Sequence, residues 1–270
     1  MKKKKKIYKF FKKKYFSQIF LKDVCIIDKI INSIDPKKND LLFEIGPGLG
    51  ALTIPLCNLI DNLSVVEIDS DILKFFKKKK IFYKIDFYLK DVLSFDFLNF
   101  YLDKDKKKIR LFGNLPYNIS TKLLINLTKY NFIFKDLHFM FQKEFANRIL
   151  AQPNNKFYGR LSILIQYFFK TEKLFDISPD CFSPIPKISS TFLKLSPHKL
   201  FSELLFDVNV LSKITKIAFN SRRKVLKNSL YKLFTEKELI SLDIDSSLRP
   251  ENLSLKKYCL LTDFLIKKYI

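Results

Sequence analysis

Short apolar runs alternate with longer segments of helical periodicity through most of the chain, and no other feature constrains the fold as strongly. Helical segments such as 50–61 and 120–130 separate the apolar runs. Strands and helices that alternate with short connections are typical of a parallel sheet covered on both faces. The sequence therefore predicts an α/β fold with a mostly parallel sheet and binding sites at the carboxyl ends of its strands. The predicted strands are residues 40–46, 63–69, 84–91, 109–114, 137–142 and 190–195.

The pattern changes after a Pro-rich stretch at residues 178–189. From about Phe201 onward the sequence shows helical periodicity only. We place a boundary near 196–205 and expect a larger domain over residues 21–200 and a small all-α domain over residues 206–270.

The charge balance indicates a polyanionic partner. Lys and Arg number 50 against 27 Asp and Glu, a formal net charge of +23. Such a surplus favours nucleic acid first and an anionic membrane surface second. Lys, Ile, Asn and Phe are all abundant while Gly is scarce and Trp absent, so a drift toward AT-rich codons explains part of the lysine content. The remaining surplus still favours an acidic partner.

The N-terminus is read as a basic arm over residues 1–20. Lysine interrupts each of its apolar runs, so the segment lacks the apolar core of a signal peptide, and no run is long enough for a membrane span. We expect a soluble, cytoplasmic, monomeric protein. Its four cysteines form no CxxC pair and only two histidines accompany them, so we expect buried reduced thiols and no metal site. The cysteines are Cys25, Cys57, Cys181 and Cys259.

A glycine-rich turn follows the first predicted strand in "LLFEIGPGLGALT". Gly46, Gly48 and Gly50 allow close backbone approach and a tight turn into a helix. Glu67 ends the next strand, where a carboxylate can accept hydrogen bonds from both hydroxyls of a ribose. The alternative is a tight strand–helix turn without a binding role, with Glu67 at the next strand end by chance. The glycines run GxGxG rather than GxGxxG, and Glu44 precedes them. This combination resembles the S-adenosylmethionine loop of Rossmann-like methyltransferases rather than a dinucleotide loop.

Two further strand ends carry polar groups. Asp91 ends the third strand, where it can accept the amino group of an adenine or simply cap a turn. The fourth strand ends in "GNLPYN", whose Asn114 side chain and Leu115 carbonyl can accept hydrogen bonds from an amine. Pro116 biases Leu115 toward an extended shape, and Tyr117 offers a face for stacking a flipped-out base. The alternative is a proline turn with a packed ring.

At this point the chain resembles the KsgA family of ribosomal RNA adenine dimethyltransferases. The resemblance implies a Rossmann-like class I S-adenosylmethionine methyltransferase domain followed by a small helical domain. It also implies dimethylation of two neighbouring adenosines near the 3′ end of small-subunit rRNA, with the rRNA or a precursor of the small subunit as partner. The segments that carry it are "EIGPGLGALT", "VEID", "KDVLSFDF", "GNLPYNISTKLL", "MFQKEFANRILAQP", "YGRLSILIQ", "FSPIPKISST", "FNSRRKVLKNSL" and "RPENLS".

The resemblance also assigns site residues by position. Near the N-terminus the family has "GQNFL" or "GQHFL", whereas this chain has "SQIFL". Gln18 is retained, but Ile19 replaces the Asn or His that contacts the cofactor, so only a backbone contact can survive there. Phe182 falls where the family places a second aromatic near the target base, although a core Phe is an equal alternative. The family's cofactor contacts fall on Leu21, Gly46, Glu67, Asp91 and Asn114.

Adjacent arginines in "NSRRKVLKNSL" are the first candidates for RNA contacts. We predict one short helix here, with residues 223 and 227 on one face, and a solvated helix face is the alternative. Its basic residues are Arg222, Arg223, Lys224 and Lys227. Weaker candidates are Lys143, Arg148 and Arg160, since Glu144 is placed to pair with Arg148.

Three other functions stay open on the sequence alone. A methyltransferase acting on large-subunit rRNA would use the same chemistry. A ribosome-assembly or transcription factor would keep the fold without catalysis, although the intact Asn114 to Tyr117 set disfavours it. A nicotinamide oxidoreductase is the most distant, because the GxGxxG turn is missing.

Overall fold

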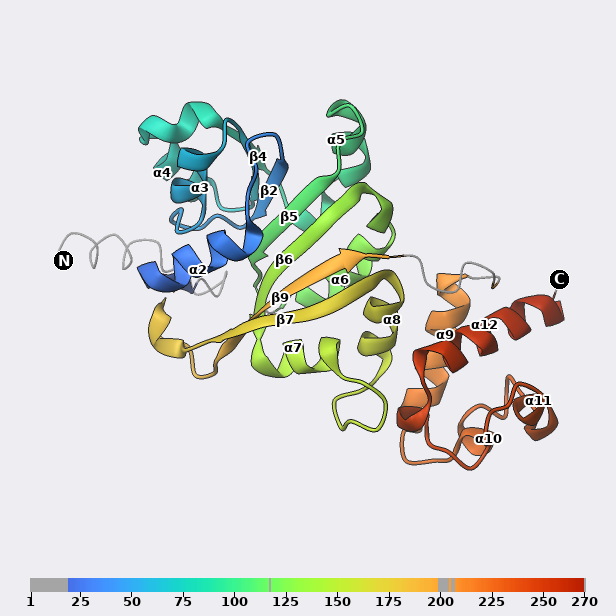
Figure 1. Cartoon of the computed structure of the whole chain (residues 1–270). Helices are drawn as coiled ribbons and strands as arrows, with labels where there is room; N and C mark the ends of the chain where they lie inside the picture. Colours follow the sequence, from blue (N-terminus) through green and yellow to red (C-terminus); the bar gives the residue numbers. More distant parts are fainter. Residues whose placement is uncertain (1–18, 117, 199–203, 205–206, 270) are drawn as a thin grey trace. The chain divides into compact units, whose positions relative to one another are not determined.

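The computed structural model describes residues 19–116, 118–198, 204 and 207–269 (Figure 1). Most of the basic N-terminal arm, with Gln18, and Tyr117 of the Asn-Leu-Pro-Tyr stretch lie outside these residues. The chain divides into two compact units. One comprises the described residues of Met1–Lys143 and Glu172–Pro197, and the other those of Glu144–Thr171 and His198–Ile270.

A seven-stranded sheet organises the first unit, in the order β4-β3-β2-β5-β6-β9-β7. Neighbouring strands from β4 to β6 pair in parallel, and β9 pairs antiparallel with β6. All six predicted strands are confirmed. The strands are β2 (Leu41–Ile45), β3 (Leu63–Glu67), β4 (Ile85–Leu89), β5 (Ile109–Asn114), β6 (Phe134–Gln142), β7 (Phe169–Ile177) and β9 (Ser190–Pro197).

Strand β7 and a separate two-stranded ribbon were not predicted. β7 lies at the sheet edge and its sequence "FKTEKLFDI" mixes charged and apolar side chains, so it has no continuous apolar run. The ribbon consists of β1 (Phe20–Leu21) and β8 (Phe182–Ser183) paired antiparallel, and two residues carry no periodicity.

Helices cover both faces of the sheet, as predicted. Successive strand residues point to opposite faces of the sheet, so the neighbours of Leu42 and Phe43 show which helices cover each face. Leu42 belongs to a buried cluster with residues of α2, α3 and α4. The Phe43 ring instead contacts the α5 rings of Phe97 and Phe100, with centroids 5.4 and 5.0 Å apart. The helices of this unit are α2 (Val24–Ile34), α3 (Thr53–Leu59), α4 (Ser70–Lys77), α5 (Phe97–Asp103) and α6 (Ser120–Thr128).

The second unit is helical around its own core. Residues 207–269 form helices and turns only, as the periodicity predicted. Its helices are α7 (Lys143–Leu150), α8 (Arg160–Phe168), α9 (Val208–Asn220), α10 (Leu226–Ser229), α11 (Glu236–Ser241) and α12 (Leu255–Tyr269).

The sequence assigned residues 144–171 to the larger domain, whereas the structure groups them with the C-terminal helices. The physical reason is a shared core. Tyr158 and Ile163 are buried with Leu211 and Tyr258, and the Tyr158 hydroxyl donates a hydrogen bond to the Leu253 carbonyl at 3.1 Å.

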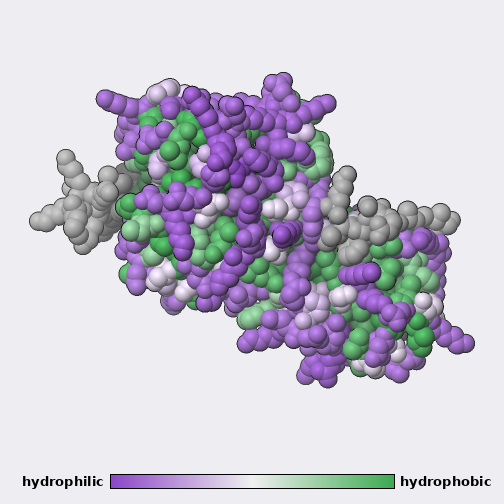
Figure 2. Space-filling view, in the orientation of Figure 1, coloured by the Kyte–Doolittle hydropathy of each residue, from purple (hydrophilic) through white to green (hydrophobic). Residues whose placement is uncertain are grey.

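On the face drawn in Figure 2, hydrophilic side chains cover most of the surface and hydrophobic ones are interspersed among them. Within the described part of the chain, none of the helices combines the length and the hydropathy that crossing a membrane requires.

Candidate active site

Four strand ends meet at one edge of the sheet. The order β4-β3-β2-β5 brings Gly46, Glu67, Asp91 and Asn114 together, each at or just after the carboxyl end of its strand. All four line one cavity of about 470 Å³. Ligands of open α/β sheets bind in this position because the chain reverses its winding there. Other residues that line the cavity are Ile19, Gly48, Ile68, Leu115, Pro116 and Ile119.

The glycine turn provides an open cradle. Gly46 has a φ of +67°, in the left-handed region, and a Cβ placed on it would meet no atom within 4 Å. Gly48 differs, because a Cβ there would lie 3.1 Å from the Phe20 ring. The space above Gly46 is therefore room for a ligand, while the next glycine lets the N-terminal segment pack against the turn.

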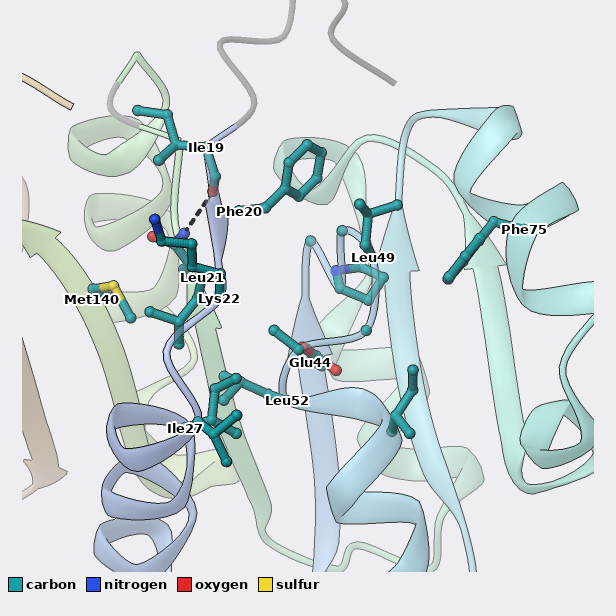
Figure 3. Close-up of a pocket in the computed structure, with 18 of the residues that line it drawn as sticks. Ile19, Phe20, Leu21, Lys22, Ile27, Glu44, Leu49, Leu52, Phe75 and Met140 are labelled. Atoms are coloured by element: carbon teal, nitrogen blue, oxygen red, sulfur yellow. Dashed lines mark hydrogen bonds between the residues drawn. The ribbon is translucent and has the colours of Figure 1, made fainter. Parts of the chain in front are cut away.

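Glu44 lies beneath the turn and is 2% exposed. Its Oε2 accepts a hydrogen bond from the Thr53 hydroxyl at 2.7 Å. Burial raises the pKa of Glu44 to about 8, and the nearby charge of Glu67 adds to the rise. Glu44 lines a second cavity of about 300 Å³ between the turn and the N-terminal segment, where Figure 3 shows it below Leu49. Leu21, an expected cofactor contact, lines this second cavity.

The two other carboxylates are partly engaged by backbone. Oε1 of Glu67 accepts hydrogen bonds from the N–H groups of Ile68 and Asp69, at 2.7 and 2.9 Å. Burial nevertheless raises the pKa of Glu67. Oδ1 of Asp91 accepts from the Leu93 N–H at 2.9 Å, so the capping role considered from the sequence is present. Each carboxylate keeps its second oxygen outside these bonds, and together with the open glycine turn they fit a nucleoside.

Asn114 ends β5 beside the N-terminal segment. Its Nδ2 donates a hydrogen bond to the Ile19 carbonyl oxygen at 3.2 Å, which is drawn as the dashed line in Figure 3. Ile19 therefore lies at the site through its backbone. A Cβ on the preceding Gly113 would collide with the carbonyl oxygen of Ile45 on the neighbouring strand. The need for glycine at position 113 was not identified from the sequence, although a glycine directly before Asn114 could have indicated it.

Sequence reasoning also missed apolar residues that line the main cavity. Ile68 is 52% exposed directly after Glu67, and Ile119 follows the Asn-Leu-Pro-Tyr stretch. Their only signal was their position next to predicted residues. An exposed isoleucine beside a carboxylate provides an apolar surface for the face of a flat ring.

Phe182 is a buried core residue. It is 1% exposed, pairs with Leu21 across the β1–β8 ribbon and lines neither cavity. The alternative of a core Phe anchoring the Pro-rich loop is the one that the structure shows. The expected place of Phe182 opposite Tyr117 lies outside what the structure describes, because Tyr117 is not among the described residues.

The arginine-rich segment also departs from its prediction. Helix α9 ends at Asn220 and α10 begins at Leu226, so Arg222, Arg223 and Lys224 lie in the turn between two helices. The predicted shared face of residues 223 and 227 is wrong, because the chain turns between them.

Several candidate RNA contacts are engaged within the protein. The Arg222 guanidinium bonds to the Glu251 carboxylate and donates to the Lys156 carbonyl at 2.7 Å. Lys227 pairs with Glu236 at 3.2 Å. Arg223 and Lys224 are exposed, and neither takes part in an ion pair among the described residues.

The weaker candidates belong to helices α7 and α8. Lys143 pairs with Asp176 at 3.1 Å, and Arg160 donates to the Ser212 hydroxyl at 2.6 Å. The possible pair between Glu144 and Arg148 is not formed, and no described acidic side chain pairs with Arg148. Over the described residues, no group of three His, Cys, Asp or Glu side chains is placed to hold a metal ion.

The fold and the site together define a class. A glycine turn after the first strand of a parallel sheet, acids at the next two strand ends and an Asn-Leu-Pro stretch at the fourth belong to Rossmann-like, class I S-adenosylmethionine-dependent methyltransferases. The dimethyladenosine transferase of Plasmodium falciparum has a similar structure, with a TM-score of 0.80, 29% identity and coverage of 93% of this chain and 98% of that one. The 23S rRNA methyltransferase ErmE shares the fold at a TM-score of 0.70 and 17% identity, covering 92% of this chain and 99% of that one.

Sequence comparison narrows the class to a family. The model of the family described as "Ribosomal RNA adenine dimethylase" matches residues 9–267. Relatives named "Ribosomal RNA small subunit methyltransferase A" include one from Buchnera aphidicola subsp. Acyrthosiphon pisum (strain APS), 49% identical over 94% of this chain and 93% of that protein. Another, from Escherichia coli (strain 55989 / EAEC), is 41% identical over the same shares of both chains. The chain belongs to the ribosomal RNA adenine dimethylase family.

Proposed function

We propose that this protein transfers methyl groups from S-adenosylmethionine to the exocyclic amines of two adjacent adenosines near the 3′ end of small-subunit rRNA. Family membership and the names of the relatives support the substrate. The observation that carries the proposal is the single cavity where the glycine turn, two carboxylates and Asn114 meet.

The residues around this cavity divide into two roles. On the cofactor side, the open face of Gly46 receives the chain of the cofactor, Glu67 holds its ribose and Asp91 its adenine amino group. When bound, S-adenosylmethionine supplies an electrophilic methyl group. Leu21 and Glu44 line the adjoining second cavity and support this side of the site from behind the turn.

The substrate side lies at the end of β5. An adenine amine is a weak nucleophile because its lone pair is delocalised into the ring. Acceptance of its N–H groups by the Asn114 oxygen and the Leu115 carbonyl favours a more tetrahedral nitrogen and stabilises the positive charge that develops on it. Pro116 restricts Leu115, and Tyr117 stacks on the extruded base. No strong base is required, since the alkylated amine loses its proton readily. Most of the acceleration comes from placing the amine in line with the sulfonium methyl group.

RNA binding is assigned to the exposed cations Arg223 and Lys224 of the turn between α9 and α10. Phosphate contacts by Arg and Lys position a protein on RNA and make its affinity salt-dependent. Arg222 shapes this turn through its bond to Glu251. Lys143, Arg148 and Arg160 remain secondary candidates.

Incubation of the purified protein with unmodified small subunits and methyl-labelled S-adenosylmethionine tests the proposal. We expect label in N6,N6-dimethyladenosine of the small-subunit rRNA. Large subunits serve as the control, and label confined to them would assign the protein to large-subunit rRNA. Absence of label from all adenosines would refute the enzymatic function and leave a binding role in ribosome assembly.

A further inference from the structure

One contact of Asn114 is not explained by the roles given above. The side-chain amide has one hydrogen-bond donor group and one acceptor, and its donor is committed to the Ile19 carbonyl at 3.2 Å. The two residues are 95 positions apart in the chain and both line the main cavity. The contact therefore joins the N-terminal segment to the proposed substrate side.

This contact fixes which end of the amide faces the ligand. The reverse orientation would set the amide oxygen against the Ile19 oxygen, and two acceptors do not bond. With Nδ2 held, Oδ1 is the free end, and among the described residues no donor bonds to it. The oxygen is the end that an amine substrate needs.

The Ile19 carbonyl is itself held in place. The two residues after it pair with β8, with Phe20 opposite Ser183 and Leu21 opposite Phe182. The Lys22 N–H then donates to the Cys181 carbonyl at 2.9 Å. These pairings bury Phe20, Leu21 and Phe182, which are 7%, 5% and 1% exposed. The β1–β8 ribbon thus fixes the backbone on the C-terminal side of residue 19.

We propose that the Ile19 carbonyl is a positioning group for catalysis: it holds Asn114 Nδ2 and so presents Oδ1 to the amine of the target adenosine. This inference rests on the proposed function. It gives Phe182 a role through the ribbon in place of a contact with the base. It also explains why an isoleucine serves at position 19, since a backbone carbonyl makes no demand on the side chain.

Replacement of Phe20 by its α-hydroxy analogue tests the carbonyl directly. The change converts the Ile19 carbonyl into an ester carbonyl, which is a weaker acceptor, removes the Phe20 N–H and leaves every side chain in place. The matched control is the same replacement at Lys22, which removes a ribbon hydrogen bond but leaves the Ile19 carbonyl an amide. We expect kcat to fall roughly fivefold to tenfold for the ester at Phe20 only, with the Kd for S-adenosylmethionine from calorimetry unchanged. Equal losses of kcat for the two esters, or no loss for either, would overturn the proposal.

Asn114→Asp provides an independent pH readout. A carboxylate accepts hydrogen bonds as well as an amide does but has no donor for Ile19, whereas its protonated form regains one. Relative to wild type at each pH, we expect kcat to be about 100-fold lower near pH 8 and to recover as the pH falls. A ratio that does not change with pH would refute the orienting contact. Wild-type protein that transfers no methyl in the same assay would refute the proposed function instead, so the two failures are distinguishable.

Discussion

Buried Glu44 makes the stability of this protein depend on pH in a way that one substitution should remove. The carboxyl is 2% exposed, and burial raises its pKa from the ordinary 4.5 to about 8. Glu67 adds to the rise and the Thr53 hydroxyl opposes it. At neutral pH the folded chain therefore keeps a proton on Glu44 that the unfolded chain has released.

The sign and size of the effect follow from linkage. The stabilising contribution of the protonated carboxyl is complete below about pH 4.5 and is lost as the pH rises through about 8. At about 1.4 kcal/mol per pH unit, the loss is at most about 5 kcal/mol. Relaxation around the new charge reduces this limit, so we expect roughly 2 to 5 kcal/mol.

Glu44→Gln tests this reasoning, because the amide keeps an acceptor for the Thr53 hydroxyl and cannot ionise. Urea denaturation of both proteins from about pH 5 to about pH 9 gives the difference in unfolding free energy, from which unrelated titrations cancel. We expect the difference to move in favour of E44Q by the amount given above. The same substitution at exposed Glu172 is the control. A difference between E44Q and wild type that stays constant over the whole range would show that Glu44 is ionised like an ordinary carboxyl.

Three further predictions concern other parts of the molecule. Arg110→Met should lower the unfolding free energy by about 3 to 5 kcal/mol, measured by urea denaturation, because the buried Asp136 carboxylate loses its arginine partner and Asp40 keeps only Lys135. A loss below about 1 kcal/mol would contradict that reasoning. Tyr117→Ala should lower kcat far more than the affinity for S-adenosylmethionine in kinetics and calorimetry, and equal losses would remove the stacking role. Arg223→Ala with Lys224→Ala should weaken RNA binding and reduce the salt slope of the binding constant by about two, and an unchanged slope would exclude the turn from the interface.

The sequence predicted the strands that position the site because each contains a short, mainly apolar run. Strands β2, β3 and β5 are buried on both faces, whereas edge strand β4 is only partly buried. Edge strand β7 escaped prediction because its outward side chains are charged. The predicted helix through Arg222 failed for a different reason. The charged residues of this segment are compatible with a helix. The chain turns instead, because Arg222 bonds to Glu251 and Leu226 is buried, and both contacts depend on distant parts of the chain.

Strand order explains why these site residues could be predicted from the sequence. Gly46, Glu67, Asp91 and Asn114 each end a predicted strand, so parallel pairing alone brings them to one edge. The contact of Asn114 with Ile19 follows no periodicity and no motif, because it joins a strand end to a segment held by a two-residue ribbon.

Because Gly113 has no side chain, strands β2 and β5 can approach closely between the glycine turn and Asn114. Ile45 leads into the glycine turn and Gly113 leads into Asn114, and the two residues are register partners on adjacent strands. A methyl group at position 113 would force these strands apart next to the proposed site of methyl transfer. In the proposed function, the distance between the cofactor side and the substrate side therefore depends on the contact of these two backbones, and an alanine at position 113 would increase it.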